Sequence, residues 1–229
     1  MGKLILVRHG TTVLNSQGES ERLRGWLDVP LDENGLRQAW EAADKIAEHP
    51  IQTIYCSDLI RAQQTAKPIA DLTRIPVIPT RALRPWNVGS LAGQRVNTIL
   101  GTLKKLEEDP NLPAPQGESF IEFYDRYSGV LKNLLVQASR SSKHIVAVTH
   151  VRNVLATPTI LKDGDKTQIP VKGGAKPGSV IWVEQTDGRW VARAHEGASP
   201  ACSHSWPTDD RGAVAPCSCG GLAAADGGL

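Results

Sequence analysis

Two short apolar runs, 3–7 and 145–149, constrain the fold of this chain most strongly. Both are rich in aliphatic residues and lack the apolar–polar alternation of a half-exposed strand, so each predicts a strand buried on both faces. Segments with helical spacing of apolar residues separate such runs, as at Leu36, Ala39 and Ala43. Strands that alternate with helices predict an α/β fold, a three-layer α/β/α sandwich with a largely parallel central sheet.

The same patterns place the other elements. Further strands are expected at 51–55, 75–78, 180–184 and 190–194, the last two as a hairpin around Thr186-Asp187-Gly188. Helices are expected at 33–48 after an Asp32 cap, from a cap at Ser57 or Asp58 to 72, at 96–108, at 120–139 after a Ser119 cap, and at 153–161. The segment 81–95 has little periodicity and is expected to be a loop.

Composition excludes several classes of function. The chain has 229 residues, with 26 Lys and Arg against 24 Asp and Glu, for a net charge of +2. This balance gives no bulk affinity for polyanions, so no nucleic-acid partner is expected. No apolar run approaches the roughly 20 residues that span a bilayer, so no membrane partner is expected either.

Composition also divides the chain. Residues 1–197 are expected to form one domain, and the residues 198–229, rich in Ala, Gly, Ser and Pro, a disordered low-complexity tail. The tail residues Cys202, His204, Cys217 and Cys219 are spaced unlike zinc ligands, so no metal is expected. Cys56 is the remaining cysteine, and a domain without a disulfide framework fits a cytoplasmic location.

Polar side chains follow the first buried strand directly, in the order Arg8, His9, Gly10. Ligands of open parallel sheets bind beyond the carboxyl ends of the strands, so a cation and an imidazole are expected at a ligand site. Gly10 allows a sharp turn or a close approach to a ligand. Polar groups that could contact a phosphate follow at Thr11, Thr12 and Asn15.

Two further strand ends carry related residues. Arg61 lies in the first turn of a predicted helix, where a cation opposes the helix dipole unless it meets an anion. His150 follows the strand 145–149. Two imidazoles and the guanidiniums of Arg8 and Arg61 together predict a site for a phosphoryl group.

These segments resemble the histidine phosphatase superfamily, also called the phosphoglycerate mutase-like family. The matching stretches are LVRHGTT, GWLDVPLDENGLRQA, YCSDLIRAQQTA, GES at 117–119 and VTH ending at His150. They follow the family's order and span almost all of residues 3–196. The resemblance implies the phosphoglycerate mutase-like sandwich and a phosphatase that needs neither metal nor cofactor.

The resemblance also implies a mechanism. His9 is expected to attack phosphorus and form a phosphohistidine, with its other ring nitrogen donating to a backbone carbonyl. Arg8, Arg61 and a protonated His150 are expected to hold the non-bridging oxygens, with a further hydrogen bond from Asn15. Water then releases phosphate.

The sequence departs from the family at the proton donor. Pro85 stands where the family usually has a Glu, and Ser90 stands where a carboxylate is frequent. Three explanations stay open. Another carboxylate supplies the proton, the candidates being Glu19, Asp58 and Glu118; or the substrate has a good leaving group; or turnover is weak.

Other departures concern the rim of the site. Val151 and Arg152 replace the small residues that often follow the second histidine. Arg152 is expected to face solvent, with a substrate contact as the alternative. Trp26 and Trp86 lie on the loops expected to border the pocket, where they are expected to support those loops, with substrate binding as the alternative.

The sequence thus predicts a phosphomonoesterase acting on a small phosphorylated metabolite through phospho-His9. Two alternatives stay open. One is a cofactor-dependent phosphoglycerate mutase, which the short connection before His150 disfavours. The other is a non-catalytic phosphate-binding or interaction module, which Pro85 favours and the intact His9 disfavours.

Overall fold

Six strands among the described residues form one sheet in the order β3-β2-β4-β1-β5-β6. The structure is a computed structural model that describes residues 1–15, 21–164 and 175–194. The strands are β1 (Leu4–Arg8), β2 (Ile51–Ser57), β3 (Val77–Thr80), β4 (His144–Thr149), β5 (Val180–Thr186) and β6 (Arg189–Ala194). The strands β1 to β4 pair in parallel, while β5 and β6 join antiparallel.

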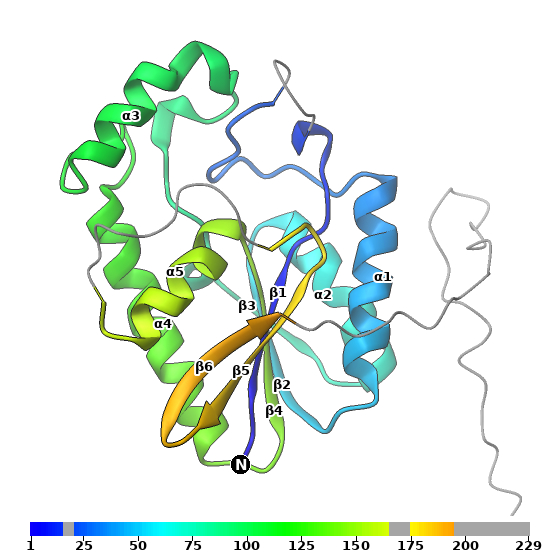
Figure 1. Cartoon of the computed structure of the whole chain (residues 1–229). Coiled ribbons are helices and arrows are strands. Elements are labelled where there is room, and N and C mark those ends of the chain that lie inside the picture. Colours follow the sequence, from blue (N-terminus) through cyan, green and yellow to red (C-terminus); the bar gives the residue numbers. More distant parts are fainter. Residues whose placement is uncertain (16–20, 165–174, 195–229) are drawn as a thin grey trace, which may run out of the picture. The chain divides into compact units, whose positions relative to one another are not determined.

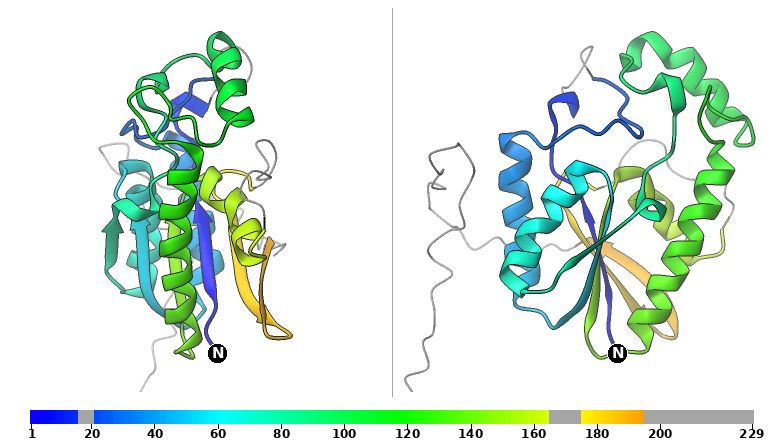
Figure 2. Two further views of the ribbon diagram at one scale, coloured as in Figure 1. Left: turned by 90° about the vertical axis from the view of Figure 1, so that its left-hand side faces the viewer. Right: turned by 180° about the vertical axis from the view of Figure 1, so that it is seen from behind.

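Helices cover both faces of this sheet, which confirms the predicted three-layer sandwich (Figures 1 and 2). One face carries α1 (Glu33–Ala47) and α2 (Ile60–Thr73), and the other carries α4 (Phe120–Ser139) and α5 (Val151–Leu161). The short helix α3 (Leu100–Glu108) lies beyond the carboxyl ends of the parallel strands (Figure 1).

The two faces are built from alternate residues of the same strands. In β1, Ile5 and Val7 join the core cluster shared with α1 and α2, whereas Leu4 and Leu6 join the cluster shared with α4 and α5. All four are fully buried, and each such burial contributes about 1.5–3 kcal/mol. This double burial explains why the apolar run lacks polar alternation.

The start of α2 differs from its prediction. Neither Ser57 nor Asp58 caps it, because β2 continues through Ser57 and the N-cap is Leu59, which has no capping side chain. The backbone N–H of Ile60 instead donates to Asp28 Oδ1 at 2.6 Å. A residue distant in sequence therefore caps α2.

Most other expected boundaries agree with the structure to within a few residues. Asp32 caps α1, and Ser119 caps α4 in a reciprocal capping box with Glu122. The differences are a β3 that begins after Pro76, a 3-10 turn at Val96–Ile99 before α3, short 3-10 turns at Arg81–Leu83 and Gly89–Leu91, and an α5 that starts at Val151.

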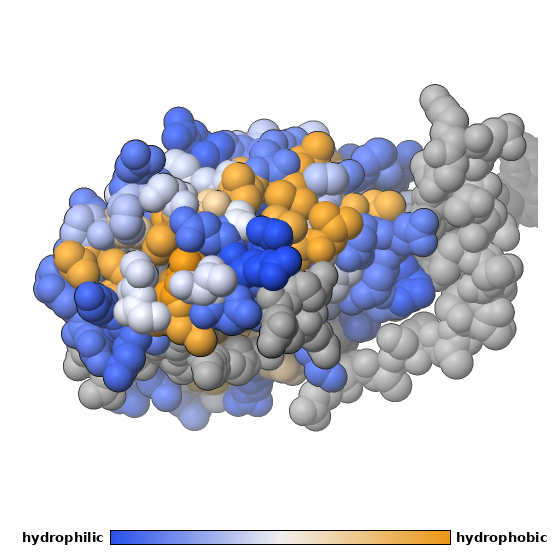
Figure 3. All heavy atoms as spheres, turned by 90° about the horizontal axis from the view of Figure 1, so that it is seen from above, coloured by the Kyte–Doolittle hydropathy of each residue, from blue (hydrophilic) through white to orange (hydrophobic). Residues whose placement is uncertain are grey.

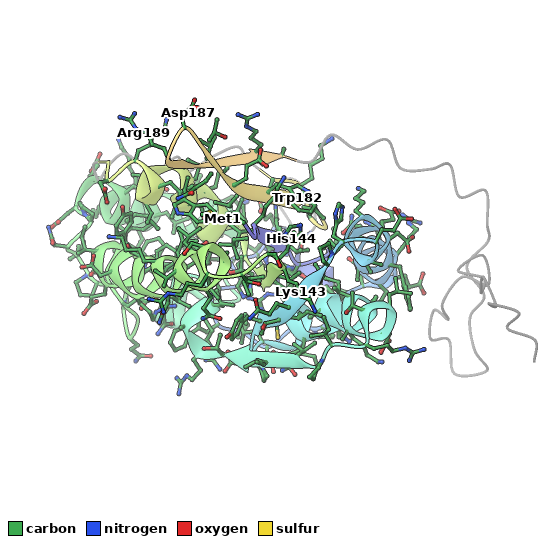
Figure 4. All side chains as sticks on the ribbon, turned by 90° about the horizontal axis from the view of Figure 1, so that it is seen from below. Met1, Lys143, His144, Trp182, Asp187 and Arg189 are labelled. Carbon is green, nitrogen blue, oxygen red and sulfur yellow. The ribbon has the colours of Figure 1, made fainter. Side chains whose placement is uncertain are left out.

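The predicted hairpin is confirmed at Asp187 and Gly188, both with positive φ, which connect β5 to β6 (Figure 4). Figure 4 views the sheet from the end where its parallel strands begin. His144 and Trp182 lie there, with ring centroids 5.6 Å apart. His49 also contacts Trp182, at 4.7 Å between centroids, so these two histidines are separate from the strand ends that carry His9 and His150.

Two glycines allow the loop after β1 to pack closely against the start of α1. A Cβ added to Gly35 would lie 2.1 Å from the Thr11 carbonyl oxygen, and one added to Gly10 would lie 2.4 Å from that of Gly35. Both obstacles are backbone atoms, so a side chain at either position requires the loop that carries His9 to move.

Replacing Gly35 with alanine is expected to lower the free energy of unfolding by about 3 kcal/mol, because the added methyl group overlaps backbone. Gly129, in the middle of α4, is the matched control, since its Cβ would meet nothing within 4 Å. Gly129→Ala is expected to stabilise the protein by about 0.5–1 kcal/mol. Urea unfolding of both variants tests the contact, and equal effects would contradict it.

No helix in the described ranges combines the length and the apolar character needed to cross a bilayer.

Candidate active site

The pairing of β1 with β4 brings the two predicted histidines together. The strands run in parallel register with Arg8 opposite Thr149, and the His9 N–H donates to the Thr149 carbonyl at 3.0 Å. His9 and His150 each follow directly, so both imidazoles leave the same edge of the sheet. Their ring centroids lie 5.0 Å apart with planes at 63°.

The ring of His9 is oriented by its own loop. Its Nδ1 lies 2.7 Å from the Gly10 carbonyl oxygen, and because a carbonyl only accepts, Nδ1 carries the hydrogen. The lone pair is then on Nε2. Burial, followed by the charge of Arg61, lowers the pKa of His9 well below its ordinary value. The imidazole is therefore neutral at pH 7 and can act as a nucleophile.

Arg61 supplies a buried positive charge beside the histidines. The residue is 1% exposed, and its Nη1 and Nη2 donate to the carbonyl oxygens of Leu27 at 2.6 Å and Gly25 at 2.8 Å. Burial, then the charge of Arg24, lowers its pKa to about 10, so it stays charged at neutral pH. Its Nε has no hydrogen-bond partner among the described residues. A buried cation held by carbonyls is suited to an anionic ligand.

Arg8 is a second cation near the histidines. Its Nη1 donates to the Ala175 carbonyl oxygen at 2.6 Å, and its side chain is not among those lining the cavity described below. Burial lowers its pKa to about 10. Its charge nevertheless contributes to lowering the pKa of both His9 and His150.

His150 is deeply buried and has a lowered pKa in the absence of a ligand. The residue is 2% exposed, and neither ring nitrogen has a hydrogen-bond partner within the part of the chain that the structure describes. Burial, then the charge of Arg61, lowers the pKa of His150 well below its ordinary value. His150 is therefore neutral at pH 7 without a bound anion, and its expected protonation while it holds a phosphoryl group stays a prediction.

The histidines and Arg61 face one cavity of about 110 Å³ at the carboxyl ends of the parallel strands. Apolar and charged side chains alternate over this face of the molecule (Figure 3). The lining residues are His9, Leu23, Arg24, Gly25, Arg61, Pro85, Trp86, Val88, Leu103, His150, Val151 and Arg152. Two imidazoles and several guanidiniums therefore meet in a partly apolar pocket.

Comparison with known proteins agrees with this geometry. The sequence profile of the histidine phosphatase superfamily (branch 1) matches residues 4–196. The chain belongs to this superfamily. A relative from Yersinia pestis, named probable phosphoglycerate mutase GpmB, is 32% identical over 152 residues, which cover 64% of this chain and 69% of the relative. A protein of the same name from Proteus mirabilis is 33% identical over 153 residues, with the same coverage.

Solved structures share the fold of this superfamily member. A mycobacterial glucosyl-3-phosphoglycerate phosphatase, solved with VO3, has a TM-score of 0.73 and 26% identity, covering 86% of this chain and 100% of that one. A Bacillus anthracis phosphoglycerate mutase has a TM-score of 0.70 and 22% identity, covering 84% of this chain and 92% of that one. Both phosphatases and mutases thus share its architecture.

Arg24 is a cavity residue that sequence reasoning missed. After burial, its charge is the largest influence lowering the pKa of Arg8 and of Arg61, so it lies near both. Its Nη1 donates to the Leu14 carbonyl oxygen at 3.2 Å. The segment that carries Arg24 has no periodic pattern. The sole local signal for this residue was its position directly before Gly25, where the matching stretch GWLDVPLDENGLRQA begins.

Arg152 and Trp86 line the cavity, whereas Trp26 does not. The expectation that Arg152 faces solvent is wrong, since its side chain is 21% exposed. Trp26 supports the loop as expected: its Nε1 donates to the Pro85 carbonyl at 2.8 Å, and the guanidinium of Arg84 stacks 4.7 Å from its ring centroid.

The four residues predicted to bind phosphate through the first loop do not line the cavity. Asn15 Oδ1 accepts from the N–H and hydroxyl of Thr12, and the Thr11 hydroxyl donates to Asp32. The Gly10 N–H donates to Thr65 at 3.2 Å. These bonds hold the loop that carries His9, and direct phosphate contacts by these residues stay a prediction.

The candidate proton donors lie elsewhere. Asp58 accepts two hydrogen bonds from Arg84, at 2.7 and 2.8 Å, and this contact lowers the pKa of Asp58. Glu118 pairs with Arg126 at 2.6 Å and accepts from the Asn87 N–H, while Glu19 lies outside the described residues. Pro85 lines the cavity, and no Asp or Glu does so within the part of the chain that the structure describes.

Among the described residues, the site contains neither a disulfide nor a cluster of metal ligands. Cys56 is buried and free. Across residues 1–15, 21–164 and 175–194, no group of three or more His, Cys, Asp or Glu side chains could hold a metal ion. The tail cysteines predicted to be without metal lie outside these ranges.

Stability is expected to fall as the pH drops below about 6.5. The unfolded chain protonates its histidines near that pH, whereas burial depresses the pKa of His9 and His150 in the folded state. Between the two pKa values the unfolded state binds more protons, so each histidine lowers the free energy of unfolding by at most about 1.4 kcal/mol per pH unit. Urea unfolding from pH 7.5 to 5.0 measures this slope.

The variant His150→Gln removes the contribution of His150 to the pH dependence of the free energy of unfolding, because an amide does not titrate. Its slope is expected to be shallower than that of the wild type, whatever its absolute stability. A slope equal to that of the wild type would show that His150 is not the depressed group.

Proposed function

We propose that this protein is a phosphatase, a phosphomonoesterase that transfers the phosphoryl group of a small phosphorylated substrate to His9 and then to water. The observation that carries the proposal is the neutral His9, with Nδ1 held by Gly10, beside His150 and Arg61 on one cavity. A pocket that merely binds phosphate has no need of an oriented nucleophile.

The first step uses the lone pair of His9 Nε2. It attacks phosphorus in line with the leaving oxygen, and the bond from phosphorus to that oxygen breaks. Negative charge spreads over the three non-bridging oxygens, where Arg61 and Arg8 stabilise it. A bound dianion also favours protonation of His150, because it offsets the charge of Arg61, so His150 can then donate a hydrogen bond to the phosphoryl group.

Two alternatives have support of their own. The curated relatives named probable phosphoglycerate mutase favour a mutase, which returns the phosphoryl group to its substrate instead of to water. The cavity has no carboxylate among its described lining residues, which favours a non-catalytic phosphate-binding module. The intact nucleophile and its oriented ring favour the phosphatase over the binding module. The short connection before His150 disfavours the mutase.

Hydrolysis assays separate these functions. Turnover of p-nitrophenyl phosphate, whose leaving group needs no proton, is expected for the phosphatase. Interconversion of 3- and 2-phosphoglycerate faster than phosphate release would instead support the mutase. Phosphate binding without turnover of p-nitrophenyl phosphate or of any phosphorylated metabolite would support the binding module.

We also propose a cytoplasmic location and a domain that ends near residue 197. The domain proposal is supported by the family match, which ends at residue 196. The location is supported by Cys56, which is buried and forms no disulfide with any described residue. No cofactor takes part in the proposed reaction.

A further inference from the structure

Arg152 occupies a position that the stability of its own helix disfavours. It lies in the first turn of α5, where the N-terminal end of the helix dipole repels a cation. Its side chain is nevertheless turned into the cavity and is 21% exposed. The helix dipole therefore does not account for the position of the Arg152 side chain, which depends on contacts with other parts of the protein.

Contacts with Trp86 and Glu107 are among those that place its guanidinium. The guanidinium carbon lies 6.0 Å from the ring centroid of Trp86, and Nη2 lies 3.9 Å from Glu107 Oε1 on α3. Burial lowers the pKa of Arg152, whereas Glu107 raises it, and a guanidinium remains charged at neutral pH throughout. A fixed positive charge thus faces the apolar wall of the pocket.

The place of this charge is informative. Trp86 directly follows Pro85, the residue at the position where the superfamily usually has its proton donor. Pro85, Trp86 and Arg152 all line the cavity that His9 faces, so this cation borders the space into which a leaving oxygen departs. An arginine does not give up a proton at neutral pH, but it stabilises an oxygen that leaves as an anion.

Leaving groups differ greatly in their need for a proton. An alcohol is a very weak acid, comparable to water, so an alkoxide needs a proton to leave. A carboxylic acid has a pKa of about 4, and the second ionisation of a phosphate monoester is near 6. At pH 7 the latter two leave as stable anions, whereas an alkoxide does not. A pocket lined by an arginine in place of a carboxylate is suited to the anions.

We propose that Arg152 binds the leaving group of an anhydride substrate, in which the transferred phosphoryl group is bonded to a carboxylate or to a second phosphate. This inference rests on the proposed transfer of the phosphoryl group to His9, and it extends the proposed function from phosphate monoesters to phosphoanhydrides, which it takes to be the preferred substrates. Aryl phosphates such as p-nitrophenyl phosphate are accepted because their leaving groups also depart without a proton.

The reaction balances without an acid. His9 Nε2 forms a bond to phosphorus, and the bond to the bridging oxygen breaks with its electron pair on that oxygen. The departing carboxylate or phosphate anion pairs with Arg152. Water then adds to the phosphorus, the electron pair of the phosphorus–nitrogen bond returns to Nε2, and both protons of the water leave with the phosphate as dihydrogen phosphate.

The test compares leaving groups in the whole protein. Pyrophosphate, acetyl phosphate and β-glycerol phosphate are assayed with the wild type, Arg152→Met and Arg152→Lys. The exposed Lys104→Gln on α3 is the control. The wild type is expected to favour the two anhydrides over the alkyl ester by at least about 100-fold in kcat/KM. Arg152→Met is expected to lose about 10–100-fold on pyrophosphate, with partial recovery in Arg152→Lys.

A second readout separates binding of the leaving group from a structural role. Once phospho-His9 has formed, the leaving group has departed, so its hydrolysis rate is expected to be unchanged in Arg152→Met. A slowed hydrolysis, or equal losses on pyrophosphate and β-glycerol phosphate, would overturn the inference. So would a wild type that hydrolyses the alkyl ester as well as the anhydrides, although the proposed function would then stand. No turnover of any substrate and no phosphoenzyme would instead refute the proposed function.

Discussion

Replacing His9 with alanine is expected to reduce hydrolysis of p-nitrophenyl phosphate by at least about 10⁴-fold, because the variant has no nucleophile to accept the phosphoryl group. The remaining cations would still bind phosphate. The loss is therefore expected mainly in kcat, and steady-state kinetics with competing inorganic phosphate separate the two effects.

His49→Ala is the matched control for this experiment. His49 is exposed and contacts Trp182 at the opposite end of the sheet, so this variant is expected to keep activity within about twofold of the wild type. Substantial turnover by His9→Ala, with binding and folding intact, would contradict covalent catalysis by His9.

The second large effect is expected at Arg61. Replacing it with glutamine is expected to lower kcat/KM by about 10³-fold, because a buried guanidinium no longer balances the charge of the transferred phosphoryl group. Arg61→Lys keeps the charge but loses the planar, two-point geometry, so partial activity is expected. The same assay with p-nitrophenyl phosphate measures both variants.

Arg37→Gln on α1 is the control for charge removal, since Arg37 is 53% exposed and pairs with Glu41. It is expected to change activity by less than about twofold. If Arg61→Gln also retained wild-type activity, Arg61 would not be one of the cations that stabilise the transferred phosphoryl group.

The convergence of the two histidines could be predicted from the sequence for a physical reason. Each follows a strand buried on both faces, and parallel strands end at the same edge of a sheet, so His9 and His150 had to lie near that edge. The pairing of β1 with β4 turned that proximity into contact. Arg61 was predicted in the same way, from its place just after the next strand.

Arg24 could not be placed from the sequence, because its position depends on contacts distant along the chain. Its segment is bound to the residues before α3 by a bridge between Arg22 and Arg95 and by the hydrogen bond from Leu23 N–H to Gln94. Local patterns carry no information about such pairs.

Arg152 was misplaced for a different reason. α5 was expected to start at Asn153, which would have left Arg152 in a loop open to solvent. The helix begins at Val151 instead, and its first turn directs Arg152 toward Trp86. An error of two residues in a helix boundary was enough to change the predicted role of a side chain.

Trapping the phosphoenzyme tests the central claim most directly. The protein is mixed with p-nitrophenyl phosphate, quenched in alkali within milliseconds and digested, and the peptide that contains His9 is analysed by mass spectrometry. We predict one phosphate on His9, stable in alkali and lost in acid, that forms and decays at rates consistent with kcat. Hydrolysis at the full rate while His9 stays unmodified would contradict the account.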